Sequence, residues 1–268
     1  MKRLNLPPVT LGTVIVCTVI FILSLFSGME NAAESAILCG AYYKPFIMCG
    51  EYWRFLTAGL VHVSFLHLAV NMFSLTSMGS FMELKMGHLK YAVILFGSVI
   101  GGSLFTFCTE GNTVTIGLSG GLYGLLAGYS VIVFSMDLAK IPVIRTSLIR
   151  TYVICVLMNF MPAISVTGHI GGYIAGLFLT ALLSEETKKK FKSIHFRIAA
   201  VLYAAVLCIF TYRGWRIPAE QIYMRSDYNI LKRECEIGLK SHAVRMAERL
   251  DVLYDSEDTL SWLIREDN

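Results

Sequence analysis

Long apolar runs, separated by short polar segments, make up most of the chain. Seven of these runs are long enough, or nearly so, to cross a hydrocarbon core, which needs about 20 helical residues. They lie near residues 9–27, 64–82, 89–108, 114–136, 148–164, 166–183 and 196–212. The pattern predicts an all-α polytopic membrane protein in which a six-helix block is followed by a seventh, C-terminal transmembrane helix.

The polar segments divide this pattern into three parts. Residues 1–185 are expected to form the six-helix block, including an outer loop at 28–63 whose Tyr, Trp, Phe and Met content predicts a structured element at the membrane interface. A basic loop then leads into the seventh helix, and together they occupy 186–212. The tail at 213–268 has apolar residues at helical spacing between 243 and 253, which predicts an amphipathic helical segment.

Composition supports an integral membrane protein. Of the 268 residues, 55% are hydrophobic and 16% are charged, whereas soluble domains carry about a quarter charged residues. The mean hydropathy is +0.61. The first run follows Met1-Lys2-Arg3 but lacks a small-residue cleavage site, so it is interpreted as a retained helix and not as a signal peptide.

The distribution of Lys and Arg predicts the orientation. If the N-terminus is cytoplasmic, the short outer loops hold only Lys44 and Arg54. The inner segments then hold Lys2, Arg3, Lys85, Lys90, Lys140, Arg145, Arg150, Lys188, Lys189, Lys190, Lys192 and Arg197. Because positive residues favour the cytoplasmic side, we expect a cytoplasmic N-terminus and an extracytoplasmic tail. The expected location is a bacterial cell membrane, which the chain would cross several times.

The seven cysteines contain no Cys-x-x-Cys pair and suggest no metal site. Cys17, Cys108, Cys155 and Cys208 lie in or at the ends of predicted spans, where a thiol serves as a small apolar side chain. Cys39 and Cys49 share the outer loop, so either a disulfide or two free thiols is compatible with the sequence.

Two predicted spans carry glycine at every fourth position. Gly120, Gly124 and Gly128 form one such ladder. Gly168, Gly172 and Gly176 form the other. A ladder of this kind makes a flat helix face that lets another backbone approach closely, and by itself it most often indicates packing only.

Each ladder is accompanied by a residue with catalytic chemistry. Ser119 directly precedes the first ladder, and His169 follows the first glycine of the second. Both helices run from outside to inside, so the two residues fall at similar depth, within about two turns of the outer surface at 1.5 Å per residue. If the helices are neighbours, the imidazole can take the serine proton, and Tyr123 on the same face as Ser119 can stack on the ring.

A third polar group lies on the second predicted helix. His62 sits at the membrane boundary, and His67 and Asn71, four residues apart, share one face. Polar residues are costly in lipid and should face the interior of the bundle. They could donate hydrogen bonds to a developing oxyanion together with the backbone N–H of Ser119, or they could satisfy loop carbonyls.

Acidic residues are absent from the interior of the predicted spans, and no His-Glu-x-x-His motif occurs. Glu83, Glu110 and Asp137 fall at helix ends or in loops. This disfavours a zinc or aspartyl intramembrane protease, and it disfavours a transporter that depends on buried carboxylates.

Taken in chain order, these motifs resemble the rhomboid family of intramembrane serine proteases. They are Trp53-Arg54, His62-x4-His67-x3-Asn71, Gly117-x-Ser119-Gly120 with Tyr123, and Gly168-His169-x2-Gly172-x3-Gly176. The resemblance covers residues 9 to 185. Gly168 stands where alanine is the more usual residue of the family, the seventh helix is similar to a six-plus-one arrangement, and the tail has no assigned counterpart.

The resemblance implies a role for each motif. Ser119 would be the nucleophile and His169 the general base and later acid. His67 and Asn71 would donate to the oxyanion, Tyr123 would support the imidazole by stacking, and His62 would play a supporting part. Trp53 and Arg54 would be structural at the bilayer surface. Gly117 and Gly120 would allow close helix approach and keep the serine open to water.

The sequence therefore predicts a protease that needs no cofactor and no metal. It would hydrolyse peptide bonds in or beside the transmembrane segments of membrane proteins, through an acyl-enzyme and a Ser–His dyad. Its partners would be those substrates and the lipid bilayer, with no nucleic acid. The alternatives are a non-catalytic rhomboid-like binding protein or chaperone and, more distantly, a transporter or channel.

Overall fold

The computed structural model describes residues 6–160, 164–190 and 193–266. Lys2, Arg3 and Lys192, which enter the charge argument, lie outside the described residues, as does the 161–163 segment of the fifth predicted span. Regular structure in the described chain is helical except for one two-stranded sheet. The all-α architecture predicted from the sequence is confirmed.

Within the described ranges, four helices are both long and apolar enough to cross a membrane. They are α1 (Pro8–Leu25), α7 (His88–Thr109), α10 (Val166–Leu183) and the Ile198–Arg216 part of α12 (Ser193–Arg216). The other predicted spans correspond to α8 (Ser119–Ser135), α9 (Pro142–Met158) and a run of α5 (Phe65–Ser74), the π-helical turn η1 (Leu75–Gly79) and α6 (Ser80–Met86). The count of seven spans stays a prediction, because among the described residues only α1, α7, α10 and part of α12 are long and apolar enough to qualify.

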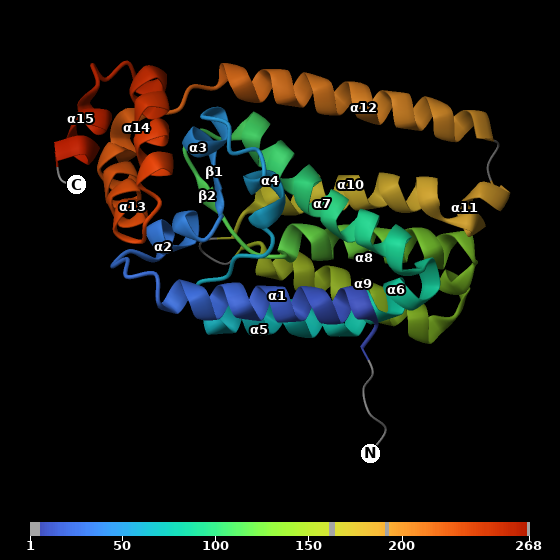
Figure 1. The fold of residues 1–268 in the computed structure, drawn as a ribbon. Coiled ribbons are helices and arrows are strands. Elements are labelled where there is room, and N and C mark those ends of the chain that lie inside the picture. Colours follow the sequence, from blue (N-terminus) through green and yellow to red (C-terminus); the bar gives the residue numbers. More distant parts are fainter. Residues whose placement is uncertain (1–5, 161–163, 191–192, 267–268) are drawn as a thin grey trace.

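The central helices are α7, α8 and α10, with α12 along one side and α1 and α5 along the other (Figure 1). The 3-10 turn η2 (Leu138–Lys140) connects α8 to α9, and α11 (Glu185–Lys190) follows α10. At the end of the bundle that carries α11, Lys90 pairs with Glu185 at 2.8 Å and Lys85 pairs with Glu186 at 3.5 Å. This basic end is the one that the sequence assigns to the cytoplasm.

Glu83 lies inside α6 and is fully buried, although the sequence places it beyond the end of a span. Its carboxylate accepts the backbone N–H groups of Val9 and Thr10 at 2.9 and 2.8 Å. These donors belong to the first turn of α1, where no intrahelical acceptor exists. The glutamate therefore caps α1 from a neighbouring helix.

Glycines pack the central helices against one another. A Cβ at Gly172 would lie 2.7 Å from the carbonyl carbon of Gly120, and a Cβ at Gly176 would collide with the backbone of Gly124. On α7, a Cβ at Gly102 would lie 2.5 Å from the carbonyl oxygen of Gly168. We call the facing glycines of these three helices the glycine core; its members are Gly101, Gly102, Gly120, Gly124, Gly168, Gly171, Gly172 and Gly176.

The outer loop is folded. It contains α2 (Ala32–Leu38), β1 (Tyr42–Tyr43), α3 (Lys44–Met48) and α4 (Arg54–Thr57). Strand β1 pairs antiparallel with β2 (Val114–Thr115), so that Tyr42 faces Thr115 and Tyr43 faces Val114. The sheet ties the loop to the segment that leads into α8.

Lys44 joins the same loop to the end of α7. Its fully buried ammonium donates to the carbonyl oxygens of Phe107 and Glu110 at 3.0 and 3.1 Å. Carbonyls in the last turn of a helix have no intrahelical donor, and a cation there also complements the helix dipole. Burial lowers the pKa of Lys44 to about 8.

The tail packs against the outer loop at the left of Figure 1. It forms η3 (Gln221–Tyr223), α13 (Met224–Glu236), α14 (Lys240–Tyr254) and α15 (Thr259–Glu266), and the spacing noted at 243–253 lies within α14. Loop and tail share one hydrophobic cluster of Ile37, Tyr43, Phe46, Cys49, Ile230, Leu231, Ala243, Met246, Ala247, Leu250, Tyr254, Leu260 and Ile264. We call residues 28–63 together with α13–α15 the outer unit.

Candidate active site

Ser119 is the first residue of α8, directly after the strand β2 and a glycine turn. Gly117 has a φ of +100° and its N–H donates to Ala58 O at 2.9 Å. A side chain at this position would meet two obstacles, since the backbone lies in the region that favours glycine and a Cβ would overlap the His67 ring. The glycine thus lets the chain turn and present Ser119 at the N-terminal end of α8.

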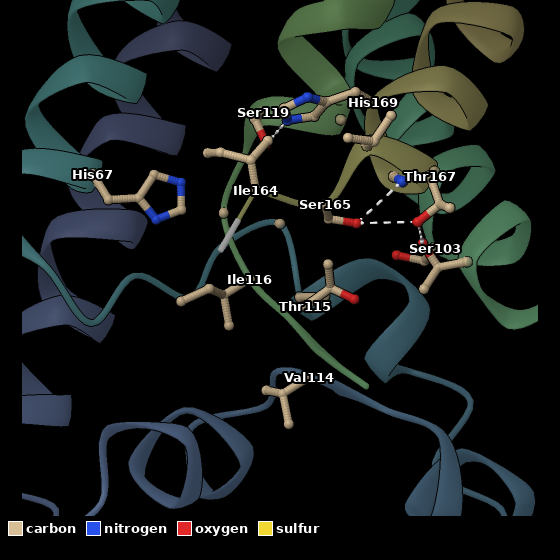
Figure 2. Close-up of a pocket in the computed structure, with 18 of the residues that line it drawn as sticks. His67, Ser103, Val114, Thr115, Ile116, Ser119, Ile164, Ser165, Thr167 and His169 are labelled. Carbon is tan, nitrogen blue, oxygen red and sulfur yellow. Dashed lines mark hydrogen bonds between the residues drawn. The ribbon is translucent and has the colours of Figure 1, made fainter. Parts of the chain in front are cut away.

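The glycine core sets the separation of Ser119 and His169. Gly120 and Gly168, each next to one of these residues, face each other: a Cβ on Gly120 would lie 3.3 Å from Gly168 O. With backbones this close, the side chains reach across a short gap, and Ser119 Oγ lies 2.8 Å from His169 Nε2. The contact is drawn in Figure 2. His169 itself is only 5% exposed.

Tyr123 supports the imidazole. Its ring stacks on that of His169 with centroids 4.0 Å apart and planes 13° from parallel. The Tyr123 hydroxyl donates to Cys155 O at 2.8 Å, which fixes the tyrosine to α9. The ring of His169 is therefore held on one face by an aromatic plane that is itself anchored.

Asn159, which the sequence interpretation did not single out, contacts the other imidazole nitrogen. Its Oδ1 lies 2.6 Å from His169 Nδ1. The available signal was a polar residue within the fifth predicted span, where a polar side chain is costly unless it has a partner. Ser119, His169 and Asn159 form a continuous hydrogen-bonded chain.

His62 and His67 lie beside the turn at Gly117. The fully buried His62 ring has Nδ1 3.3 Å from Leu60 O and Nε2 3.5 Å from the N–H of Leu118. The two histidine rings meet edge to face at 5.0 Å. His62 thus contacts the backbone just before Ser119, whereas His67 lines the cavity around the serine.

Asn71 is not among the residues that line this cavity. It is buried, and its amide nitrogen donates to the carbonyl of His67, one turn earlier, at 2.8 Å. Its Oδ1 has no hydrogen-bond partner among the described residues. The structure brings His67 to the site, but Asn71 is held one turn below it.

A cavity of about 970 Å³ opens around Ser119 and His169. His67 lies across it, the β2 segment forms one wall, and Ser103, Ser165 and Thr167 form a polar wall (Figure 2). Thr167 donates to Glu110 Oε1 at 2.5 Å. The cavity is large enough for several side chains of an extended peptide, and its polar wall can hold water.

Trp53 and Arg54 belong to the outer unit and do not touch Ser119. The Arg54 guanidinium is 1% exposed; it donates to Ile37 O and Ala41 O at 2.7 and 2.9 Å and pairs with Glu51. Its Cζ lies 4.6 Å from the centre of the Trp53 ring, which is about half exposed. This pair is the structural centre of the loop.

Cys39 and Cys49 are free thiols in this structure. Among the described residues, no group of three or more His, Cys, Asp or Glu side chains is placed to hold a metal ion.

Comparison with known proteins gives one family. Residues 49–186 match the family model described as Rhomboid domain. The chain is 30% identical to Rhomboid protease GluP of Bacillus subtilis (strain 168), over 75% of this chain and 39% of that protein. It is 31% identical to RHOMBOID-like protein 5 of Arabidopsis thaliana, over 54% and 48%.

A third relative carries a different description. Inactive RHOMBOID-like protein 8 of Arabidopsis thaliana is 33% identical over 51% of this chain and 39% of that protein. The chain spans less than half the length of each of these three relatives.

Proposed function

The chain belongs to the rhomboid family, and from this premise we propose that it is an intramembrane serine protease. It hydrolyses peptide bonds in or beside the transmembrane segments of membrane proteins. The observation that carries the proposal is the 2.8 Å contact between Ser119 Oγ and His169 Nε2 inside an open cavity. One relative is described as a protease and another as inactive, so the activity of this chain has to be measured directly.

In the proposed reaction, Ser119 Oγ attacks the scissile carbonyl while His169 Nε2 accepts the hydroxyl proton. His169 then gives this proton to the leaving amine, which releases the first product and leaves an acyl-enzyme. A water molecule, deprotonated by the same nitrogen, attacks the ester carbonyl. His169 then returns this proton to Ser119 Oγ as the ester C–O bond breaks, which releases the second product and restores the serine. No acidic residue and no cofactor takes part in this scheme.

His67 and Asn71 are proposed as oxyanion donors with the backbone N–H of Ser119. That N–H belongs to the first turn of α8, where intrahelical acceptors are missing. His67 already lines the cavity, whereas the Asn71 amide must leave His67 O and turn toward it. Its donation would then be gained only when negative charge develops on the substrate, which is the requirement for lowering the barrier.

The proposed topology places the N-terminus in the cytoplasm of a bacterial cell and the active site near the outer surface. The tail packs on the outer loop, which supports placing residues 213–268 on the same, extracytoplasmic side. The proposed division is a protease core at 1–185, a basic loop and seventh helix at 186–212, and the tail.

The second candidate function is the binding of transmembrane segments without cleavage. The relative described as inactive makes this a real alternative for the family. The presence of both Ser119 and His169 in hydrogen-bond contact favours the protease.

Labelling with a fluorophosphonate probe, together with cleavage of a transmembrane reporter, tests the proposal. Wild type should label at Ser119 and cleave, and Ser119→Ala should do neither while remaining folded. His169→Ala should be as inactive as Ser119→Ala, with the double variant no worse, because the two residues act as a unit. Cleavage by Ser119→Ala above about a thousandth of the wild-type rate would exclude this nucleophile. If the wild-type protein binds the reporter but neither reacts with the probe nor cleaves the reporter, the result favours binding of transmembrane segments without cleavage.

A further inference from the structure

Asn159 lies where α9 ends and faces three groups of the site. It is the C-cap residue of α9, ten positions before His169. Its amide nitrogen lies 3.1 Å from Cys155 O and 3.1 Å from the Tyr123 hydroxyl, and its Oδ1 lies 2.6 Å from His169 Nδ1. The side chain therefore spans the distance between a helix carbonyl and the imidazole.

The identity of these partners fixes the orientation of the amide. A backbone carbonyl only accepts hydrogen bonds, so Cys155 O must face the NH2 group of Asn159. The Tyr123 hydroxyl donates its own proton to the same carbonyl at 2.8 Å and can accept the second amide hydrogen. The amide oxygen is then left to face His169.

The orientation of the amide in turn fixes the proton on His169. An amide oxygen only accepts, so Nδ1 must carry the hydrogen that donates to it. A neutral imidazole with its hydrogen on Nδ1 has its lone pair on Nε2, the nitrogen that faces Ser119 Oγ. This is the tautomer in which a histidine can accept the serine proton.

We propose that Asn159 is a positioning residue that holds His169 in this tautomer and in the plane of the Tyr123 stack. The inference rests on the proposed protease function. It extends the Ser119–His169 pair to a chain that ends at the carbonyl of Cys155. A neutral amide suits a site between membrane helices, because an ionised carboxylate in the same place would have a large desolvation cost.

A purely structural role for Asn159 would be to end α9. Its backbone N–H already donates to the carbonyls of Cys155 and Val156 at 3.3 and 3.1 Å, without the side chain. A helix-ending role also gives no reason for Oδ1 to lie 2.6 Å from Nδ1. The two interpretations differ in what they predict for turnover in folded protein.

The test compares Asn159→Leu, Asn159→Ala and Asn159→Asp as full-length, folded protein. Leucine has a similar volume but no acceptor, so kcat for a transmembrane reporter should fall about 10- to 1,000-fold with KM little changed. Alanine leaves room for a water molecule that can accept from Nδ1 but is not fixed in place, so its loss of kcat should be smaller than that of leucine and larger than that of aspartate. Aspartate should restore kcat to within about tenfold of wild type, because the desolvation cost favours its neutral form, which accepts from Nδ1 through its C=O and donates to Cys155 O through its O–H.

Asn31→Leu is the matched control for losing an asparagine at a helix end. Asn31 caps α2 in the outer unit by accepting from Ala33 N at 2.8 Å. This variant should lower thermal stability, as loss of a cap does, and leave kcat unchanged. Thermal unfolding of each variant separates loss of fold from loss of turnover.

A folded Asn159→Leu with wild-type kcat would overturn the inference, and so would equal losses in the leucine and aspartate variants. If Asn159→Leu does not fold, the ratio of kcat between Asn159→Ala and Asn159→Asp decides, and a ratio near one overturns the inference. Failure of the protease proposal looks different, because Ser119→Ala would then retain activity or wild type would show none.

Discussion

The glycine core and the outer unit are held together by different physics. In the glycine core, backbones touch: Gly172 and Gly176 have no space for a Cβ. In the outer unit, a buried ion pair and a cluster of aromatic and aliphatic side chains fix the fold. The first region lies where lipid offers no hydrophobic drive for helix association, so close packing must replace it. In the second region, burial of apolar side chains and the pairing of buried charges stabilise the fold.

The polar network of the outer unit links its two halves. Glu51 pairs with Arg54 and also lies 2.9 Å from His242 Nε2 on α14. The other nitrogen of His242 lies 2.8 Å from Glu234 on α13. Ser119 and His169 depend on the first region for their separation, whereas the segment that leads into α8 depends on the second through the β1–β2 pair.

The largest effect should come from a single methyl group in the glycine core. Gly172→Ala places a Cβ against the Gly120 backbone, which can yield only if α8 and α10 move apart. The contact between Ser119 and His169 then lengthens, and reporter cleavage should fall about 1,000-fold or more, which we expect from loss of dyad geometry. Gly12→Ala is the control, because a Cβ at Gly12 on α1 meets nothing within 4 Å. Equal activity of the two variants would contradict the packing argument.

A charge deletion should have the next largest effect. Arg54→Ala leaves Glu51 buried and without this cation, and breaking a buried pair in this way costs about 3–5 kcal/mol. The measurement is the free energy of unfolding, with limited proteolysis of the outer loop as a local readout. Arg265→Ala removes an exposed ion pair to Glu248 in the same unit and should cost about 1 kcal/mol or less. If both variants lose a similar free energy of unfolding, burial does not determine how much each ion pair contributes to stability.

Removal of the tail should affect the outer loop strongly and the glycine core little. A chain ending at Arg216 keeps α12 and the glycine core but uncovers Ile37, Tyr43 and Phe46. Its outer loop should become protease-sensitive, because apolar side chains lose their cover. Labelling of Ser119 should stay within about tenfold of the full chain if the glycine core alone sets the separation of Ser119 and His169. A folded truncation that no longer labels would contradict this independence.

The smallest expected effect is a pH dependence of the outer unit. Asp227 is fully buried and accepts from Tyr43 and Tyr254 at 2.8 Å each, and burial, reinforced by the nearby Glu34, raises its pKa to about 6. Between about pH 4 and pH 6 the folded unit holds a proton that the unfolded chain releases. The free energy of unfolding should therefore fall as pH rises through this window, by on the order of 1–3 kcal/mol, and be flat above it.

Asp227→Asn tests this assignment. The amide cannot titrate but can still accept from one tyrosine hydroxyl, so the variant should lose much of the slope between pH 4 and pH 6. An unchanged slope would point to Glu234, whose pKa burial also raises.

Much of the arrangement around Ser119 is readable from the sequence. Helical periodicity places Gly120 and Gly168 in the two glycine ladders. Ser119 and His169 lie in the fourth and sixth predicted spans, which run in the same direction, so the two residues are predicted to lie at similar depth. These are local regularities, which a single sequence carries. The catalytic and supporting roles of these residues stay predictions.

Contacts that depend on loop conformation are not readable in this way. Asn159 reaches His169 only because the end of α9 lies near the start of α10, and the capping of α1 by Glu83 depends on which helices become neighbours. The burial of Lys44 likewise depends on where the outer loop meets the end of α7. Such contacts follow from tertiary packing, for which hydrophobic periodicity holds no signal.

The hydrogen bond between Tyr43 and Asp227 joins residues 184 positions apart. During synthesis the outer loop emerges early, but the side chains that complete its cluster are made only after the helices between them. Ile37 and Phe46 therefore stay uncovered until α13 and α14 have been synthesised and pack against the loop. Contacts between such distant segments form late because the long intervening chain must first be ordered. Strand β1, which pairs with the segment that leads into α8, thus reaches its final surroundings only after the tail has packed on the outer loop.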